Sequence, residues 1–421
     1  MIKIKLLIIS PLFAPNNRIG ALRPTKIAGL LADKGYEIDV VTEGGAGDSS
    51  YAVPERIHKI YNMKPYNAPN EIKPKPIGSY PKPLRLCVKA WRHIYFAVKG
   101  RRKEKEFFSY FKKLYSSELK NNKYDTVFTT YNPISSLMCG LYIKKKCPNI
   151  NWICDFRDPA VVDLTPKSRR RLHRSLQDRS CEAADKIVSV SNGYIKAICK
   201  DKYTDKRYMI PNGYDKTDFA HIDAQTPTDK LTITYVGALY NGERDASVLF
   251  KAISELCGDG EISLDKIRFN YAGAEFGTLK SQAQNYSVES ILENHGSLSR
   301  GDCLTLQANS HFLLLLTWNT KSYTGVFPGK FLEYMLINRP VISLTSGDLA
   351  GGEVTEVLRE GNLGIAYEEA NDAIDYAALK IYIKEQYDRF INTGATEFSP
   401  KKSVVERYVW NNLIKKIEDL L

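Results

Sequence analysis

The stretch 325–342, GVFPGKFLEYMLINRPVI, holds the residues of this chain that are best suited to chemistry. Its pattern predicts a turn rich in glycine and proline, a short helix and a buried strand. Lys330 and Glu333 stand one turn apart on that helix. The helix N-terminus offers unpaired N–H groups to a phosphate, Lys330 adds a cation, and Glu333 can accept hydrogen bonds from vicinal hydroxyls. The stretch therefore predicts a phosphate site beside a hydroxyl acceptor, as a nucleotide-sugar requires.

The position of this stretch in the chain supports that interpretation. It follows a strongly apolar run, His311–Thr317, and leads into another, Val341–Leu344. Both runs are predicted strands of an open parallel sheet, which binds ligands beyond the carboxyl ends of its strands. A capped helix with a solvated Lys330–Glu333 pair is the alternative.

The stretch resembles the donor-binding motif of retaining glycosyltransferases with the GT-B fold, the large glycosyltransferase family 4. In that family two glutamates spaced E-x7-E flank the helix start, and the second holds the nucleotide ribose. Glu333 matches the second glutamate, whereas the first falls at Gly325. The chain is more similar to a variant with P-x-K-x-x-E-Y, in which Lys330 and the turn backbone, including Gly325 and Gly329, face the donor. This departure leaves the contact to the transferred sugar unassigned.

Predicted strands and helices alternate along the whole chain, which is typical of doubly wound parallel α/β domains. With 421 residues, two domains are expected. The resemblance implies an α/β, GT-B architecture of two Rossmann-like domains facing across a cleft. We expect domains at 1–210 and 231–401, a linker at 211–230, and a terminal helix at 402–421 that crosses back to the first domain. The predicted strands are Ile4–Ile9, Glu37–Thr42, Asp125–Thr130, Asn151–Phe156, Lys186–Ser191, Leu231–Val236, Ile267–Ala272, His311–Thr317, Val341–Leu344 and Gly364–Tyr367.

Further donor contacts are expected after the first strand of the second domain. Gly237 permits close approach of the backbone, and Arg244 offers a planar fork for diphosphate oxygens. The family places a basic pair here, and only Arg244 is an equivalent in this chain. An ion pair of Arg244 with Glu243 or Asp245 is the alternative. The turn around Leu298 is similar to the family's base-binding turn.

Charged residues end the predicted strand at 151–156, in the sequence Asp-Phe-Arg-Asp-Pro at 155–159. Charges at the end of a buried strand are costly unless they pair or take part in chemistry. Asp155 and Asp158 could share an ion pair with Arg157 that directs one carboxylate toward an acceptor hydroxyl. The segment resembles D-F-R-D-P-W of the same subgroup, with Ala160 at the tryptophan. A charged network that only locks the loop is the alternative.

The loop after the first predicted strand resembles the family's opening P-x-x-G-G loop. Gly20 aligns with one of those glycines, and Arg23 follows it on the predicted helix. Both are candidate acceptor-side or cleft residues, together with Arg157. Arg23 as an ordinary helix-surface residue is the alternative.

Positive charge concentrates in segment 82–123, which has 13 Lys or Arg and 3 Glu and is rich in aromatic residues. Leu84, Val88, Trp91, Tyr95 and Val98 form one stripe at helical spacing, next to Arg85, Lys89, Arg92 and Lys99. A basic amphipathic helix of this kind is typical of an anionic membrane surface. A helix that packs on its own sheet is the alternative, and nucleic acid ranks lower because no recognition motif accompanies the charge.

Composition excludes several other classes. The eight cysteines show neither C-x-x-C nor His/Cys ligand spacing, which favours a reducing compartment without structural zinc. The first apolar run is too short for a signal peptide, and no run of about 20 apolar residues could cross a bilayer. No D-x-D or Walker-type motif is present, so we expect neither a metal nor another cofactor. The expected location is the cytoplasm, including the inner face of the membrane.

The resemblance implies transfer of a sugar from a nucleotide-diphosphate sugar to a saccharide acceptor, with retention of the anomeric configuration. The basic aromatic segment favours a lipid-linked acceptor, as in surface polysaccharide assembly. Two alternatives stay open. One is a non-catalytic binding partner at a membrane surface, suggested by the missing first glutamate, the missing tryptophan and the single donor arginine. The other is a sugar-nucleotide 2-epimerase, which shares the fold.

Overall fold

The computed structural model describes residues 4–16, 18–44, 52–64, 80–162, 165–219 and 229–421, without the side chains of 82, 89, 90, 92–94, 96, 97, 99, 100, 218 and 219. Two compact units are present. Unit 1 comprises Met1–Pro211 and Ile414–Leu421, and unit 2 comprises Asn212–Leu413. The expected linker at 211–230 is described only in part, because residues 220–228 lie outside the described residues.

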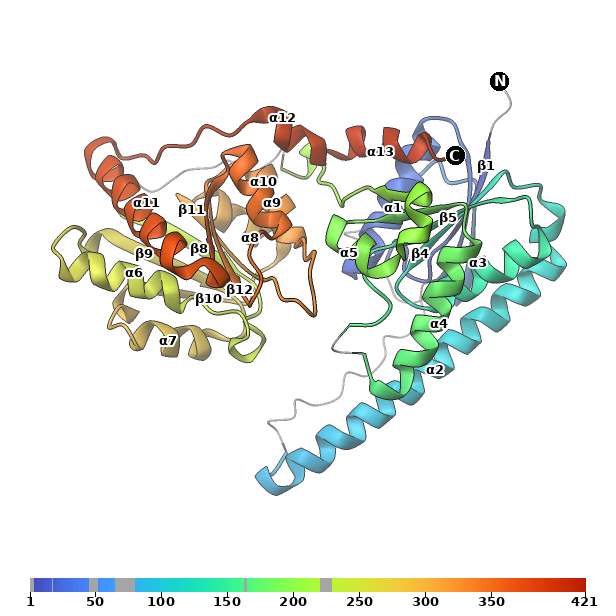
Figure 1. The fold of residues 1–421 in the computed structure, drawn as a ribbon, viewed down its shortest axis with the longest axis horizontal. Helices are drawn as coiled ribbons and strands as arrows, with labels where there is room; N and C mark the ends of the chain where they lie inside the picture. The colour runs from blue at the N-terminus through green and yellow to red at the C-terminus, as the bar shows by residue number, and fades with distance from the viewer. Residues whose placement is uncertain (1–3, 17, 45–51, 65–79, 163–164, 220–228) are drawn as a thin grey trace. The chain divides into compact units, whose positions relative to one another are not determined.

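Unit 1 is built on a seven-stranded parallel sheet in the order β3-β2-β1-β4-β5-β6-β7 (Figure 1). Its strands are β1 (Lys5–Ile9), β2 (Glu37–Gly44), β3 (Lys59–Lys64), β4 (Thr126–Tyr131), β5 (Asn151–Phe156), β6 (Lys186–Ser189) and β7 (Arg207–Met209). Its helices are α1 (Ile19–Asp33), α2 (Arg85–Ser117), α3 (Ser135–Lys146), α4 (Lys167–Ala183) and α5 (Asn192–Ile198).

Unit 2 is built on a six-stranded parallel sheet in the order β10-β9-β8-β11-β12-β13. Its strands are β8 (Leu231–Val236), β9 (Ile267–Ala272), β10 (Leu292–Gly296), β11 (Phe312–Trp318), β12 (Val341–Ser346) and β13 (Gly364–Glu368). Its helices are α6 (Ser247–Gly258), α7 (Phe276–Gln284), α8 (Arg300–Ala308), α9 (Gly329–Ile337), α10 (Glu353–Gly361), α11 (Asp372–Thr393) and α12 (Lys402–Val405). The expected α/β architecture of two Rossmann-like domains is therefore confirmed.

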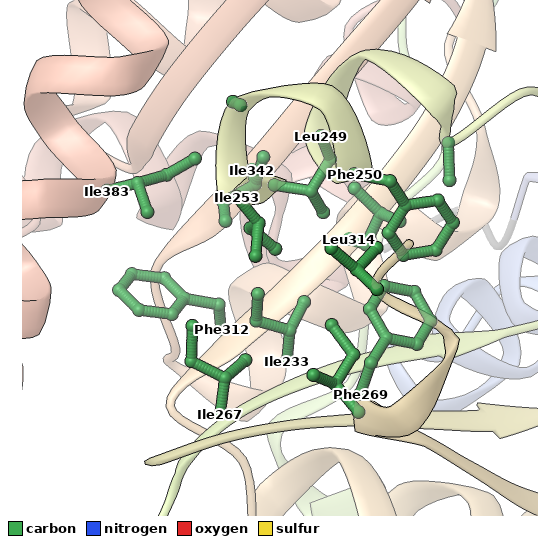
Figure 2. Packing of buried hydrophobic residues seen from close by; sticks show 14 of the residues in the cluster. Ile233, Leu249, Phe250, Ile253, Ile267, Phe269, Phe312, Leu314, Ile342 and Ile383 are labelled. Atoms are coloured by element: carbon green, nitrogen blue, oxygen red, sulfur yellow. The ribbon is translucent and has the colours of Figure 1, made fainter. Parts of the chain in front are cut away.

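Strand β11 shows why the apolar runs predicted the sheet correctly. Phe312 and Leu314 enter one buried cluster, which also contains residues of α6 and α11 (Figure 2). Leu313 and Leu315 enter a second cluster, with residues of α8, α9 and α10. Both faces of the strand are covered, so the side chains that point to either face of the sheet are apolar. The carboxyl end of β11 is thereby fixed in the middle of the sheet.

The end of the chain differs from the single helix expected at 402–421. Helix α12 ends at Val405, a short 3-10 turn follows, and α13 begins only at Trp410 and ends at Glu418. Val409 between them is extended and pairs with Tyr214 in a parallel bridge, and the N–H of Trp410 donates to the carbonyl of Tyr214. The carbonyl of Tyr408 likewise accepts the N–H of Tyr214, so the residues on either side of Val409 pair outside a helix, which interrupts the predicted continuous helix.

Helix α2 has 33 residues and consists of two different halves. Phe107 and Phe111 in its C-terminal half are fully buried, and the ring of Phe111 contacts Tyr142 of α3 edge-on. The N-terminal half extends past the sheet of unit 1 (Figure 1). In the proline-rich stretch before it, residues 65–79 lie outside the described residues.

Candidate functional site

The predicted donor residues of unit 2 gather where β8 and β11 end. The two strands are parallel neighbours, so the residues that follow them lie at the same edge of the sheet. Gly237 directly follows β8 and has φ +142°, which side-chain-bearing residues rarely adopt. A Cβ atom on Gly237 would lie 3.1 Å from Cε of Lys330. Lys330, at the start of α9, therefore passes directly over the first glycine after β8.

Arg244 reaches the same edge from the turn before α6. Its guanidinium carbon lies 4.7 Å from the ring centroid of Tyr240 and 5.5 Å from that of Trp318, the last residue of β11. Nη1 approaches the hydroxyl of Tyr235 at 3.5 Å and the carbonyl of Ala238 at 3.4 Å. The aromatic rings hold the guanidinium plane by cation–π contact.

Arg244 has unused hydrogen-bonding capacity. Among the described residues its side chain contacts Tyr235 and Ala238 and no carboxylate, and Asp245 instead accepts the N–H of Ser247 at the start of α6. Its Nε is buried and lacks a partner within the described part of the chain. A guanidinium held by rings and lacking a counter-ion is suited to bind an anion.

Glu333 is held from the neighbouring helix α8. Nε2 of the fully buried Gln307 donates to Oε1 of the half-buried Glu333 at 3.0 Å. The other oxygen of Glu333 has no hydrogen-bond partner among the described residues. Cys303 lies beside this pair: burial raises the pKa of its thiol, Lys330 lowers it and Glu333 raises it. The oriented carboxylate thus keeps one oxygen available for hydroxyl donors.

The remaining predicted donor residues lie in turns. Gly325 has φ +80° and lines a small pocket together with Trp318. Gly329 opens α9, a Cβ atom there would meet nothing within 4 Å, and the N-cap residue Pro328 supplies no side-chain hydrogen bond to the helix N-terminus. Leu298 lies two residues before α8, and its carbonyl is 4.0 Å from Sγ of Cys303.

In unit 1, the predicted catalytic residue Asp155 is completely buried at the end of β5. Nε of Arg23 donates to both carboxylate oxygens at 3.1 Å, and Nη2 donates to Oδ1 at 2.9 Å. Thr130 donates to Oδ2 at 2.9 Å. The guanidinium of Arg23 also donates to the carbonyls of Ile210 and Pro211. These contacts give Asp155 and Arg23 a structural role that ties α1, β5 and the segment after β7 together.

The expected ion pair between Asp155 and Arg157 is wrong, because Asp155 pairs with Arg23. Arg157 donates instead to backbone carbonyls: to residues 131 and 132 at the end of β4, at 3.0 and 2.6 Å, and to Gly20 at 2.7 Å. A Cβ atom on Gly20 would lie 2.8 Å from Nη1 of Arg157. A side chain at position 20 would therefore displace the guanidinium of Arg157, which connects the start of α1 to the end of β4.

Asp158 is the carboxylate of this loop that remains unengaged. It forms no hydrogen bond with the described residues, and burial raises the pKa of its carboxyl group while Arg157 opposes the shift. The backbone around it is held from α4: Gln177 accepts the N–H of Ala160 at 2.8 Å, and the ring of His173 lies 3.1 Å from the Ala160 carbonyl. A fixed loop with a free carboxyl of raised pKa is suited to acid–base work.

The predicted apolar stripe of α2 is largely exposed. The exposed fraction is 60% for Trp91 and 61% for Val98, and Leu84 and Tyr95 are exposed as well. Packing against the rest of unit 1 begins farther along the helix, where Glu104 pairs with Arg169 of α4. The alternative in which the stripe packs on its own sheet is therefore wrong for the described residues. The side chains of Lys89, Arg92 and Lys99 lie outside the described residues.

Two kinds of feature are absent from the described residues. Among them no helix is both long and apolar enough to span a membrane. Nor do three or more His, Cys, Asp or Glu side chains gather there in a way that could hold a metal ion.

Three residues that position the donor-site side chains of unit 2 were not predicted from the sequence. Gln307 orients Glu333, while Tyr235 and Trp318 contact Arg244. An aromatic residue at the carboxyl end of each central strand was the available signal for the last two. Gln307 carried no signal of its own, because its partner lies 26 positions away.

Comparisons with known proteins establish the fold. No family model and no curated protein matches the chain. Among solved structures, it is similar to sucrose-phosphate synthase from Thermosynechococcus elongatus, with 14% identity, a TM-score of 0.63 and coverage of 99% of this chain and 98% of that one. It is also similar to the lipopolysaccharide outer core galactosyltransferase WaaB, with 14% identity, a TM-score of 0.59 and 99% coverage of each chain.

A third solved structure is a putative UDP-N-acetylglucosamine 2-epimerase from Listeria monocytogenes, with 11% identity, a TM-score of 0.52 and coverage of 99% and 95%. At these identities the likeness establishes the GT-B fold. Because transferases and an epimerase are both similar in fold, function has to be argued from the residues of the site.

Proposed function

We propose that this protein is a glycosyltransferase that moves a sugar from a nucleotide-diphosphate sugar to a saccharide acceptor. One observation carries the proposal: Lys330 and Arg244 both lie at the turn that follows β8, and Glu333, one helical turn along α9 from Lys330, has its carboxylate oriented by Gln307. Two cations beside an open helix N-terminus suit a diphosphate, and a carboxylate with a free oxygen suits the ribose hydroxyls.

The proposed mechanism places the cations where charge develops. As the bond from the sugar to the diphosphate breaks, the leaving group gains negative charge, which Arg244, Lys330 and the N–H groups of α9 stabilise. These groups take the place that a divalent cation holds in other sugar transfers, so we expect turnover without added metal. Retention of configuration follows from the family resemblance alone.

On the acceptor side, we assign the acid–base role to Asp158. Its carboxyl group has a raised pKa and no hydrogen-bond partner within the described residues. It is thus better suited than Asp155, whose oxygens are occupied by Arg23 and Thr130. An ionised Asp158 would orient or deprotonate the acceptor hydroxyl.

A panel of UDP-, GDP-, ADP- and CMP-sugars tests the proposal. We expect one of them to raise the melting temperature and to be turned over with an added saccharide acceptor. A panel with no effect on melting temperature favours the non-catalytic binding role. Conversion of the sugar-nucleotide without an acceptor, with the nucleotide still attached to the product, identifies an epimerase and refutes the proposed transfer.

We further propose that the acceptor is lipid-linked and that the N-terminal half of α2 docks on an anionic lipid surface at the cytoplasmic face of a membrane. Trp91 and Val98 expose most of their apolar surface, which costs free energy in water. Segment 82–123, with 13 basic and 3 acidic residues, supplies the complementary charge. Each basic residue near such a surface contributes about 1 kcal/mol, and the contribution falls with salt.

Vesicle sedimentation tests this part. Replacing Trp91 and Val98 with serine should release the protein from vesicles of anionic phospholipid, without lowering the melting temperature. The matched control replaces two exposed isoleucines of α11, Ile374 and Ile381, and should leave binding unchanged. If the α2 variant binds vesicles as wild type does, the docking proposal is refuted. It is also refuted if wild type does not bind the vesicles and the substitutions instead convert a dimer into monomers.

A further inference from the structure

We propose that Glu275 is a positioning residue: through the loop of residues 237–241 it holds Arg244 in the geometry that binds the donor diphosphate. Glu275 lies just beyond the carboxyl end of β9, and β9 is the parallel neighbour of β8, which the loop follows. The inference rests on the proposed function, because it concerns how the same site is kept in shape.

The carboxylate of Glu275 collects three consecutive backbone donors. Oε2 accepts the N–H groups of Leu239 at 2.6 Å and Tyr240 at 3.2 Å, and Oε1 accepts that of Asn241 at 2.8 Å. Bonds from these N–H groups, chiefly that of Asn241, lower the pKa of Glu275. The carboxylate therefore remains ionised at neutral pH and acts as a fixed anion inside the turn.

The backbone of this turn is unfavourable without such an anion. Tyr240 has φ +53° and Asn241 has φ +58°, so two adjacent residues with side chains adopt the left-handed conformation. That conformation brings successive N–H groups to one side, where they form a concave site for an anion. The bonds to Glu275 offset the strain, and strained backbone of this kind is often found at functional sites.

Arg244 is tied to the part of the loop that Glu275 holds. Its backbone N–H donates to the carbonyl of Leu239 at 3.0 Å, and its guanidinium lies on the ring of Tyr240. Because Arg244 lacks an ion pair within the described residues, the rings and carbonyls of this edge are what fix its position. A shift of residues 239 and 240 would therefore move the guanidinium.

Glu275→Gln is the direct variant, because a glutamine amide cannot accept hydrogen bonds through its nitrogen and loses at least one of the three. Asp265→Asn is the matched control: Asp265 also accepts a local hydrogen bond, from Ser263, but it precedes β9 at the opposite end of the sheet. Both variants are compared with wild type in the full-length protein. The measurements are hydrogen exchange of the amides of residues 239–241 and kcat/KM for the nucleotide-sugar found in the panel.

We expect Glu275→Gln to speed exchange at residues 239–241 and to lower kcat/KM about tenfold, with the control unchanged. In an Arg244→Ala background the same substitution should lower kcat/KM less than twofold, because its effect passes through Arg244. An unchanged kcat/KM in Glu275→Gln, or an equal tenfold loss in both backgrounds, overturns the inference while leaving the transfer activity standing.

Failure of the proposed function would look different. In that case wild-type protein turns over none of the nucleotide-sugars, and binding of inorganic pyrophosphate replaces turnover as the readout. The inference then stands only if Glu275→Gln weakens pyrophosphate binding in the wild-type background and not in the Arg244→Ala background. Unchanged hydrogen exchange at residues 239–241 overturns it whichever readout is used.

Discussion

Replacing Glu333 with alanine removes the carboxylate proposed to hold the nucleotide ribose. In the structure Oε1 accepts one bond from Gln307, and the other oxygen is unpaired among the described residues, which leaves acceptor capacity for two vicinal hydroxyls. A hydrogen bond to a charged group contributes about 1.5–3 kcal/mol. Because both ribose hydroxyls lose a charged acceptor, we expect a loss near the upper end of that range, which corresponds to roughly a hundredfold increase in nucleotide Kd.

Isothermal titration with the nucleotide that binds wild type measures this loss. Glu356→Ala, which removes an exposed carboxylate from α10 of the same unit, is the matched control and should leave Kd unchanged. Glu333→Gln separates charge from shape, because an amide oxygen can still accept from Gln307; we expect an intermediate Kd. A Glu333→Ala protein that is folded and binds the nucleotide as wild type does would refute the assignment of this edge as the donor site.

Three further predictions concern catalysis and stability. Arg244→Ala should lower kcat about 10²-fold while EDTA leaves wild-type turnover intact; loss of activity in EDTA that magnesium restores contradicts the metal-free mechanism. Asp158→Asn should lower kcat and leave nucleotide Kd unchanged, whereas an unfolded variant indicates a structural role. Burial lowers the pKa of His311 from 6.5 to about 4, so the unfolded chain binds more protons between those values. The contribution of His311 to the free energy of unfolding should therefore be fully present above pH 6.5 and fall by about 3 kcal/mol toward pH 4. Urea unfolding at a series of pH values measures this fall, and His311→Asn should reduce it.

The sequence predicted the central strands well and three edge strands not at all. β3, β7 and β10 lie at the sheet edges and were missed. β10 has the sequence LENHG, and three of its five residues are exposed. An edge strand covered on fewer sides needs no continuous apolar run, so periodicity does not reveal it. The interior strand β11 is covered on both faces and therefore needs a continuous apolar run, and this run identified it in the sequence.

The candidate site was predictable where its chemistry is local. Lys330 and Glu333 are three positions apart, and Gly237 directly follows a recognisable strand, so spacing alone pointed to them. The partner of Asp155 is Arg23, which lies 132 positions away, and a sequence contains no sign of such a pairing. Arg157, two positions from Asp155, was the nearest basic residue in the sequence, but it donates to backbone carbonyls instead.

Helix α2 shows what periodicity can and cannot decide. Its apolar stripe predicted an amphipathic helix, and the same pattern fits a helix packed on a sheet or one lying on a lipid surface. The C-terminal half packs within unit 1, because Phe107 is fully buried there. The N-terminal half has an equally apolar stripe, yet 60% of Trp91 is exposed within the described chain. The exposed half is therefore the part of the helix that the proposed lipid docking concerns, and the concentration of Lys and Arg along the helix is the reason for proposing an anionic surface.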